Sequence, residues 1–345
     1  MENNKKVIVG LSNGVDSSVS LLLLKKQGYE PIGVSFKYSN ENFSIAKKVC
    51  KKLDVPYRII DCRFDFKKKV IGYFLKTLKE KKTPSPCLIC NKLVKFNKLI
   101  EFANKKKADY IATGHYARIK ENKKTNKYEL LQATDKKKDQ SYFLCFLNQK
   151  ELSRIIFPLG EYTKEEVYKI AKKEGFKFFD KIKQSQDLCF LAQDSILNYL
   201  EKKIGFEPGD IVNQNGNVLG KHKGLHFYTI GQRKGIGLTG GPWWVKGFNK
   251  KKNYLIITNK ENDSDLFKKE IILIDFNLIS NQIFKKTIKV KAKTRYNQGL
   301  SSAKISLLNN KKLKLVFDKS QKAITPGQWA VFYQGNICLG GGIIN

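Results

Sequence analysis

Apolar and polar positions alternate along the first third of the chain with the spacing of an α/β fold. Short runs rich in Val, Ile and Phe, typical of strands buried on both faces, are separated by stretches with helical periodicity. Strands are predicted at residues 7–9, 31–36, 57–60 and 110–113, and helices at residues 17–27, 43–53, 66–82 and 92–107. This alternation predicts a parallel sheet with helices on its faces.

The pattern changes in the second half of the chain. Helical character continues through residues 142–156, and Thr163 begins a capping box for a helix that ends at Gly175. After residue 205 short alternating runs take over, joined by turn signals such as Asn215-Gly216. Strands are predicted at residues 211–212, 225–230, 254–258, 288–292, 303–308 and 313–317. We therefore expect an α/β nucleotide domain followed by one or two small β domains.

The loop between the first strand and the first helix, Gly10 to Ser18, is rich in small residues. Such a turn gathers free backbone N–H groups and the positive end of the helix dipole, so it can bind an anion. Ordinary strand-to-helix turns also use Gly and Ser, but the density of small residues favours a phosphate loop. The lysine-containing P-loop pattern is missing here. A G-x-G-x-x-G pattern occurs at residues 235–240, but Gly241 and Pro242 follow it, so we expect a loop there.

The motif S-x-G-V-D-S at residues 12–17 resembles the pyrophosphate-binding loop of the N-type ATP pyrophosphatases. Enzymes of that class cut ATP between its α and β phosphates and leave an adenylate. Asn13 stands where the class usually has Gly, and Asn tolerates a left-handed backbone better than other non-glycine residues. The resemblance predicts ATP as the nucleotide.

The composition suggests the hypothesis that the protein binds a polyanionic partner. The net charge of +35 suits a nucleic acid, but nearly all of the excess is lysine, as an AT-rich genome would produce whatever the function. No apolar run approaches the length of a membrane span, and no apolar signal region precedes the first strand. Seven irregularly spaced cysteines suggest reduced thiols. We therefore expect a cytoplasmic protein with no membrane partner.

Cys87 and Cys90 form a Cys-x-x-Cys pair after two prolines, which suits half a zinc site, a redox pair or two core residues. No second Cys-x-x-Cys or spaced histidine pair accompanies them, so a structural zinc site is disfavoured. With Asn91 as an N-cap, Cys90 is expected at a helix N-terminus, where the dipole favours a thiolate. Cys189 lies in a polar-then-apolar segment, and beside an adenylating loop and a cysteine pair it suggests sulfur chemistry. Core positions are predicted for Cys50, Cys62, Cys145 and Cys338.

From end to end the chain resembles the tRNA-specific 2-thiouridylases. The resemblance implies an N-terminal adenine nucleotide α-hydrolase-like (PP-loop) domain at 1–205, a small central β-rich domain at 206–270 and a C-terminal β-barrel at 271–345. The matching stretches are Gly10 to Ser18, Pro84 to Phe96, Ala112 to Tyr116, Lys138 to Leu144, Ser185 to Phe190, Gly231 to Gly235, Lys293 to Tyr296 and Thr325 to Ile344.

The resemblance also implies roles for single residues. Cys90 would be the nucleophile, Cys189 would carry a persulfide, and Asp16 would act through Mg²⁺ at the phosphates. The residues implied to contact ATP are Gly10, Leu11, Ser12, Asn13, Gly14, Val15, Asp16, Ser17, Phe36 and Gly114. Those implied to contact tRNA are Lys138, Asp139, Gln140, Arg295 and Tyr296, with Ser85, Pro86 and Cys87 beside the target base. His115 is expected to be a hydrogen-bonded structural histidine.

The implied reaction is ATP-dependent 2-thiolation of uridine 34, the wobble position, in tRNAs that read Lys, Glu and Gln codons. The enzyme would be a tRNA-uridine 2-sulfurtransferase supplied by a persulfide donor such as a cysteine desulfurase or a sulfur-relay protein. Three departures concern the base and any metal: Ser85 replaces a common Asn, Cys87 replaces a common Asp, and residues 38–45 lack an acidic, cysteine-containing stretch. A [4Fe–4S] cluster on Cys87, Cys90 and Cys189 is a second mechanism, which we do not favour because no fourth ligand is evident.

Two other functions fit the same residues. A small-molecule ligase of the ATP pyrophosphatase class would need neither Cys90 nor Cys189 and would turn over without RNA. A non-catalytic RNA-binding protein would use the β domains alone and would bind RNA unchanged when ATP or the cysteines are removed.

Overall fold

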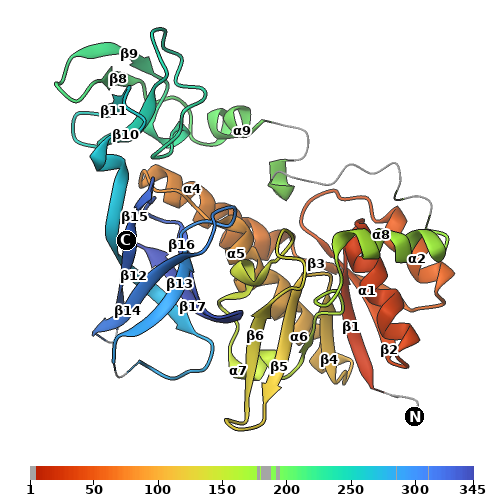
Figure 1. The fold of residues 1–345 in the computed structure, drawn as a ribbon. Helices are drawn as coiled ribbons and strands as arrows, with labels where there is room; N and C mark the ends of the chain where they lie inside the picture. The colour runs from red at the N-terminus through yellow and green to blue at the C-terminus, as the bar shows by residue number, and fades with distance from the viewer. Residues whose placement is uncertain (1–4, 177–178, 180–187, 192–194, 285, 310) are drawn as a thin grey trace.

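The computed structural model describes residues 5–345 except 177–178, 180–187, 192–194, 285 and 310. It has three parts: an N-terminal α/β part, a small central β part reached through α9 (Ile196–Lys203), and a C-terminal barrel (Figure 1). No helix in the described ranges is long and apolar enough to cross a membrane. The α/β expectation and the C-terminal β-barrel are both confirmed.

A parallel sheet forms the centre of the N-terminal part, in the order β3-β2-β1-β4-β7. Its strands are β1 (Lys6–Leu11), β2 (Glu30–Lys37), β3 (Tyr57–Asp61), β4 (Tyr110–Thr113) and β7 (Ile155–Ile156). The β1 side chains alternate between two cores: Val7 and Val9 pack with α1 (Val15–Lys26), and Ile8 packs with α6 (Phe96–Lys105). The central strand is therefore covered on both faces, as its apolar run predicted, whereas Ile59 of the edge strand β3 is 44% exposed.

The other helical elements of this part surround the sheet. They are α2 (Ser44–Lys52), α3 (Arg63–Asp65), η1 (Phe66–Ile71), α4 (Gly72–Lys79), α5 (Pro86–Cys90), η2 (Asn91–Lys95), η3 (Ser141–Leu144), α7 (Gln149–Leu152) and α8 (Lys164–Lys173). Thr163 caps α8 with the predicted capping box, and Gly28 follows α1 with a φ of 82°. The helix expected from residue 92 begins earlier, because Pro86 provides the preset φ of a first helical residue.

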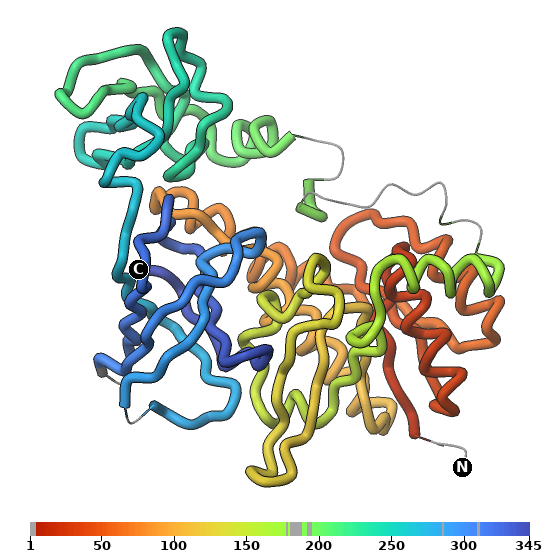
Figure 2. The backbone as a smooth tube through the Cα atoms, viewed as in Figure 1, coloured from red at the N-terminus to blue at the C-terminus, as the bar shows by residue number. Residues whose placement is uncertain are grey.

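A hairpin that the sequence pattern did not predict joins the N-terminal part to the barrel. It consists of β5 (Ala117–Asn122) and β6 (Lys127–Gln132), and β6 pairs with β17 (Ile337–Ile344) through Leu130 and Leu131. Figure 2 shows the hairpin, in yellow, between the blue barrel and the red N-terminal strands. The two parts are therefore linked by backbone hydrogen bonds as well as by side-chain packing.

The central part contains β8 (Gly209–Val212), β9 (Val218–His222), β10 (Trp244–Asn249) and β11 (Tyr254–Thr258), in the order β10-β11-β8-β9. Ile211, Val245 and Leu255 form the centre of its small core. The strand predicted at residues 225–230 is wrong: a short 3₁₀ helix, η6 (Leu225–Phe227), lies there after Gly224 with a φ of 154°. Residues 235–240 form a loop, as predicted.

The C-terminal barrel is closed by the pairing of β12 with both β15 and β17. Its strands are β12 (Phe267–Leu278), β13 (Ile288–Lys293), β14 (Ser301–Asn309), β15 (Lys312–Lys322), β16 (Trp329–Gln334) and β17. Leu273, Leu315 and Phe332 are fully buried inside it. A Cβ on Gly340 would lie 2.0 Å from the Asn277 carbonyl oxygen, so only glycine allows β12 and β17 to approach this closely.

Candidate active site

A cavity of about 620 Å³ opens where β1, β2 and β4 end, at the carboxyl edge of the parallel sheet. It is lined both by the predicted phosphate loop and by the three cysteines singled out in the sequence. The loop side is formed by Gly10, Leu11, Ser12, Asn13, Asp16, Ser17, Phe36, Thr113, Gly114 and His115. The cavity is also lined by Tyr38, Pro86, Cys87, Cys90, Asn91, Lys95, Gln140, Phe143 and Cys189. Residues far apart in the sequence thus meet in one cavity.

The phosphate loop is held by its own serine side chains. The backbone N–H of Ser12 donates to the Ser17 hydroxyl oxygen at 3.0 Å, and the N–H of Gly14 donates to the Ser12 hydroxyl oxygen at 3.1 Å. Helix α1 begins directly after Gly14, so its free N-terminal N–H groups lie beside the cavity. Asn13 does not use a positive φ; its side chain instead hydrogen-bonds to Asn42 and to the N–H of Ala46 at 3.4 Å.

Gly114 explains how β4 and the loop come together. A Cβ at this position would lie 2.8 Å from the Ser17 nitrogen and 2.9 Å from the Asp16 carbonyl carbon. Any other residue would push the first turn of α1 away from β4. Gly10 and Phe36 are neighbours, since a Cβ on Gly10 would lie 3.5 Å from the Phe36 ring. Gly10 therefore lies beside Phe36, and Gly114 lies beside the first turn of α1.

Asp16 is held by two residues that the sequence analysis did not identify. The Lys164 ammonium lies 2.6 and 2.7 Å from its two carboxylate oxygens, and the Tyr116 hydroxyl donates to it at 2.8 Å. Burial and the neighbouring Asp16 charge raise the pKa of Tyr116 well above its usual value, so its hydroxyl stays a donor. Neither residue belongs to a local motif with Asp16, which is why pattern reading missed them.

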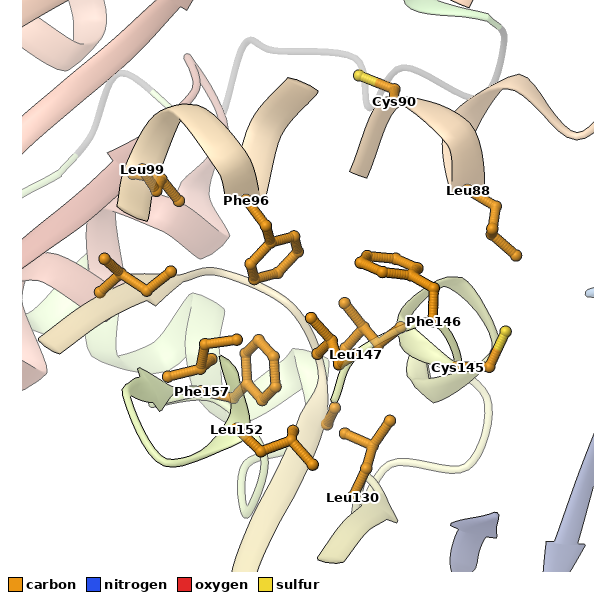
Figure 3. Packing of buried hydrophobic residues seen from close by; sticks show 14 of the residues in the cluster. Leu88, Cys90, Phe96, Leu99, Leu130, Cys145, Phe146, Leu147, Leu152 and Phe157 are labelled. Atoms are coloured by element: carbon orange, nitrogen blue, oxygen red, sulfur yellow. The ribbon is translucent and has the colours of Figure 1, made fainter. Parts of the chain in front are cut away.

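Cys90 lies at the last residue of α5, one turn after the start of a helix that continues into η2. The expectation that it occupies a helix N-terminus is wrong, because the helix begins at Pro86 with Ser85 as its N-cap. Burial raises the pKa of Cys90, while the Lys95 charge lowers it. In Figure 3 its sulfur points away from the packed rings of Phe96 and Phe146. The Cys90 side chain is therefore buried, and it also lines the cavity.

Cys189 begins the short helix η5 (Cys189–Leu191), lines the cavity and is exposed. Surrounding protein raises its pKa to about 12, and the nearby thiols of Cys90 and Cys87 add to the effect. Residues 185–187 of the matching stretch lie outside the described residues. All seven cysteines are free thiols. Cys50, Cys62, Cys145 and Cys338 are buried, as predicted.

The residues of the cavity would hold a magnesium ion only together with the phosphates of a bound nucleotide. Asp16 is the one carboxylate of the predicted loop, and Mg²⁺ commonly uses one or two carboxylates together with substrate phosphates. Among the described residues no three His, Cys, Asp or Glu side chains are grouped to hold a metal. Cys87, Cys90 and Cys189 line one cavity without forming such a group.

The predicted RNA residues divide into three kinds. Gln140 lines the cavity, and Tyr296 lies 4.5 Å from the Phe143 ring that also lines it. Arg295 is exposed and donates to the carbonyl oxygens of Lys322 and Ala323 at 3.0 and 3.1 Å. Asp139 differs: it is 3% exposed and accepts hydrogen bonds from Gln132, Ala133 and Ser141, so its carboxylate organises the loop from within.

His115 makes the predicted structural hydrogen bond and also lines the cavity. Its Nδ1 lies 2.7 Å from the Thr113 hydroxyl, and its ring stacks on Phe96. Burial and the Lys95 charge lower its pKa well below the usual value, so the ring is neutral. Lys95, Tyr38 and Phe143 are further cavity residues without an assigned role in the sequence analysis; the stretches Pro84 to Phe96 and Lys138 to Leu144 contained two of them.

Three family models cover almost the whole chain. Residues 5–193 match a tRNA methyl transferase HUP domain, 197–259 a tRNA methyl transferase PRC-barrel domain and 268–344 an aminomethyltransferase beta-barrel domain. The chain is 42% identical to the tRNA-specific 2-thiouridylase MnmA of Clostridioides difficile, over 99% of this chain and 98% of that protein. It is 43% identical to the MnmA of Clostridium botulinum strain Alaska E43 and 39% identical to that of Clostridium perfringens, with the same coverage.

Proposed function

Because the chain belongs to the tRNA-specific 2-thiouridylase family, we propose that it replaces the C2 oxygen of uridine 34 in tRNA by sulfur, using ATP. One observation carries the proposal beyond the family name. A single cavity is lined both by the loop that resembles that of the ATP pyrophosphatases and by Cys90 and Cys189. Adenylation and sulfur transfer can therefore take place on one base without its release.

The first step makes the C2 oxygen a good leaving group. The oxygen attacks the α-phosphorus of ATP, a bond forms between them, and pyrophosphate leaves. The loop from Ser12 to Ser17 and the first turn of α1 hold the departing pyrophosphate by backbone N–H groups and hydroxyls. Phe36 and Gly114 flank the adenosine. Mg²⁺, bound by Asp16 and the phosphates, would supply further positive charge.

The second step delivers sulfur from a persulfide on Cys189. The Cys90 thiolate attacks the inner sulfur, a Cys90–Cys189 disulfide forms and hydrosulfide is released. Hydrosulfide attacks C2, the C2–oxygen bond breaks, and AMP leaves with the oxygen; a thiol then reduces the disulfide. The exposed position of Cys189 supports loading by an external donor, and the inward position of Cys90 supports sulfur release inside the cavity.

The aromatic rings around the cavity support the RNA contacts that we propose. A wobble uridine must unstack from its neighbouring bases before its C2 can react in the cavity. Aromatic rings beside the cavity can stack on such an unstacked base. Phe143 and Tyr296 form such a pair, one ring from each of the two joined parts of the fold. We assign Lys138 and Arg295 to phosphates, and Ser85, Pro86 and Cys87 to the target base. Asp139 contributes through loop geometry.

Incubation of the full-length protein with unmodified tRNA, ATP and a persulfide donor tests the proposal, with mass analysis of the digested nucleosides. We expect 2-thiouridine at position 34 only when all three are present, and none with Cys189→Ser. Turnover of ATP without RNA would support a small-molecule ligase instead. RNA binding that is indifferent to ATP and to both cysteines, without thiolation, would support a binding protein.

A further inference from the structure

Lys95 is a cation in the cavity that has no anionic partner among the described residues. It is half-buried at the end of η2 and lines the cavity with Cys87 and Cys90. In the part of the chain that the structure describes, no oxygen lies within hydrogen-bond or ion-pair distance of its ammonium. Its neighbours on the same helical stretch are engaged: Lys98 pairs with Asp65 and Glu101 at 3.1 and 3.0 Å, and Lys92 lies over the Trp329 ring. An unpaired, partly desolvated ammonium is unfavourable unless an anion joins it.

The helical stretch that carries Lys95 places it in the same cavity as the cysteines. The π-helical turn η2 widens the register, and Cys87, Cys90, Asn91 and Lys95 all line the cavity from this continuous stretch. A π-helical turn inside a longer helix is frequent at functional sites. The same residue type three positions earlier, Lys92, does not line the cavity.

Lys95 lines the same cavity as His115 and Cys189. His115 follows Gly114, which lies against the first turn of α1. Burial lowers the pKa of His115 and raises that of Cys189, and the Lys95 charge lowers both. The charge of Lys95 therefore acts both on a residue next to the phosphate loop and on a sulfur-bearing residue.

The anion expected at this place follows from the reaction proposed above, on which this inference rests. After adenylation the α-phosphoryl group is bonded to adenosine on one side and to the C2 oxygen on the other. It must therefore lie between the nucleotide loop and the sulfur. The carboxylates that line the cavity already have partners: Asp16 binds Lys164, and Glu41 accepts from the N–H groups of Tyr38 and Ser39. We propose that Lys95 is a catalytic residue that binds the α-phosphoryl group.

This contact acts in both steps without a proton transfer by Lys95. In adenylation the bond from the C2 oxygen to phosphorus forms and the bond to pyrophosphate breaks. In thiolation the carbon–sulfur bond forms, and the electron pair of the breaking carbon–oxygen bond passes to AMP. A fixed ammonium beside the non-bridging oxygens stabilises the negative charge in both transition states.

The contact between Lys95 and the phosphate can be tested without any turnover, by comparing the affinities of two ligands for two proteins. AMP and adenosine, which differ by the phosphate alone, are titrated calorimetrically into the full-length protein and into Lys95→Met. We expect Lys95→Met to weaken AMP binding about tenfold or more and adenosine binding less than about twofold, since a charge-assisted hydrogen bond is lost with the phosphate only. Lys95→Arg should restore most of the AMP affinity, and Lys92→Met is the matched control.

Equal loss of AMP and adenosine affinity would show a structural role, and no change in either would show that Lys95 does not contact the phosphate. A wild-type protein that fails to distinguish AMP from adenosine would also overturn the inference. If Lys95→Met does not fold, Lys95→Gln takes its place. The proposed function is tested separately. If the protein gives the expected AMP and adenosine affinities but does not thiolate tRNA, the phosphate contact stands and the proposed reaction is wrong.

Discussion

Lys164 and Asp16 form an ion pair that joins α8 to the first turn of α1, with the ammonium 2.6 and 2.7 Å from the two carboxylate oxygens. Their side chains are 13% and 33% exposed, so the pair is shielded but not fully buried. The loop thus acquires a nearby lysine by tertiary packing, although its motif contains none. The pair keeps the carboxylate from repelling phosphates and fixes its orientation.

Lys164→Met should weaken ATP binding about tenfold, because it leaves an unpaired carboxylate beside the phosphates; the effect is smaller than for a fully buried pair. Calorimetric titration with ATP measures the change. Lys169→Met is the control, since Lys169 pairs with Glu165 at 2.8 Å on the exposed face of the same helix. Similar affinities for the two variants would contradict a role of Lys164 at the nucleotide.

ATP should be converted to AMP and pyrophosphate, and only when tRNA is present. The loop has the residues of a pyrophosphatase motif and lacks the lysine pattern of phosphoryl-transfer loops. Chromatography of labelled nucleotides after a single turnover distinguishes the products. Stoichiometric ADP would falsify this prediction.

Arg295→Ala should weaken tRNA binding and reduce the slope of log K against log salt by about 0.9, the value of one phosphate contact. Arg295→Lys keeps the charge and should keep most of the slope, although it loses the hydrogen bonds to Lys322 and Ala323. A salt titration of all three proteins measures this. Parallel lines for wild type and Arg295→Ala would remove Arg295 from the RNA contacts.

Cys90→Ser and Cys189→Ser should each abolish thiolation, whereas Cys87→Ser should retain much of it, because two cysteines suffice for a persulfide–disulfide cycle. Protein purified without oxygen should be colourless and active with a persulfide donor. Brown anaerobic protein with about four irons per chain, inactivated by chelation, would instead establish a cluster mechanism.

The alkylation rate of Cys189 should rise about tenfold per pH unit from pH 7 to pH 10, since the thiolate is the reactive form. The sign follows from the raised pKa of about 12: below that pH the thiol is protonated, and each unit of pH increases the small thiolate fraction. Peptide mass spectrometry after timed iodoacetamide treatment measures the rate. A plateau near pH 8.5, as for a free cysteine, would contradict the raised pKa.

The sequence predicted four of the five strands of the parallel sheet because these are apolar runs, and the range predicted for β4 agrees with the structure to the residue. The fifth strand, β7, lies in residues 142–156, for which helical character was predicted. The hairpin of β5 and β6 was missed because its residues, such as Lys120 and Glu121, are polar and its partner β17 is remote in sequence. The strand predicted at 225–230 failed because Gly224 turns the chain there. The pattern of apolar residues along the chain indicates which local segments are buried. The pairing of strands that are remote in sequence leaves no such pattern.

The same distinction applies to the site. Ser12 and Cys90 were found because motifs contain them, and the cavity brings them together. Lys164 and Lys95 could not be singled out from the many lysines of the chain, because only folding places Lys164 beside Asp16 and leaves Lys95 without a partner among the described residues. The helix start at Cys90 was misplaced because Pro86 was not used as the stronger signal.

The pairing of β6 with β17 has a consequence for how the molecule is made. Leu131 pairs with Ile337, so during translation the outer edge of β6 has no strand beside it until the ribosome has delivered nearly all of the described chain. An unpaired edge is a template for wrong partners. That edge of β6 is therefore closed only when β17, the last strand of the barrel, is in place.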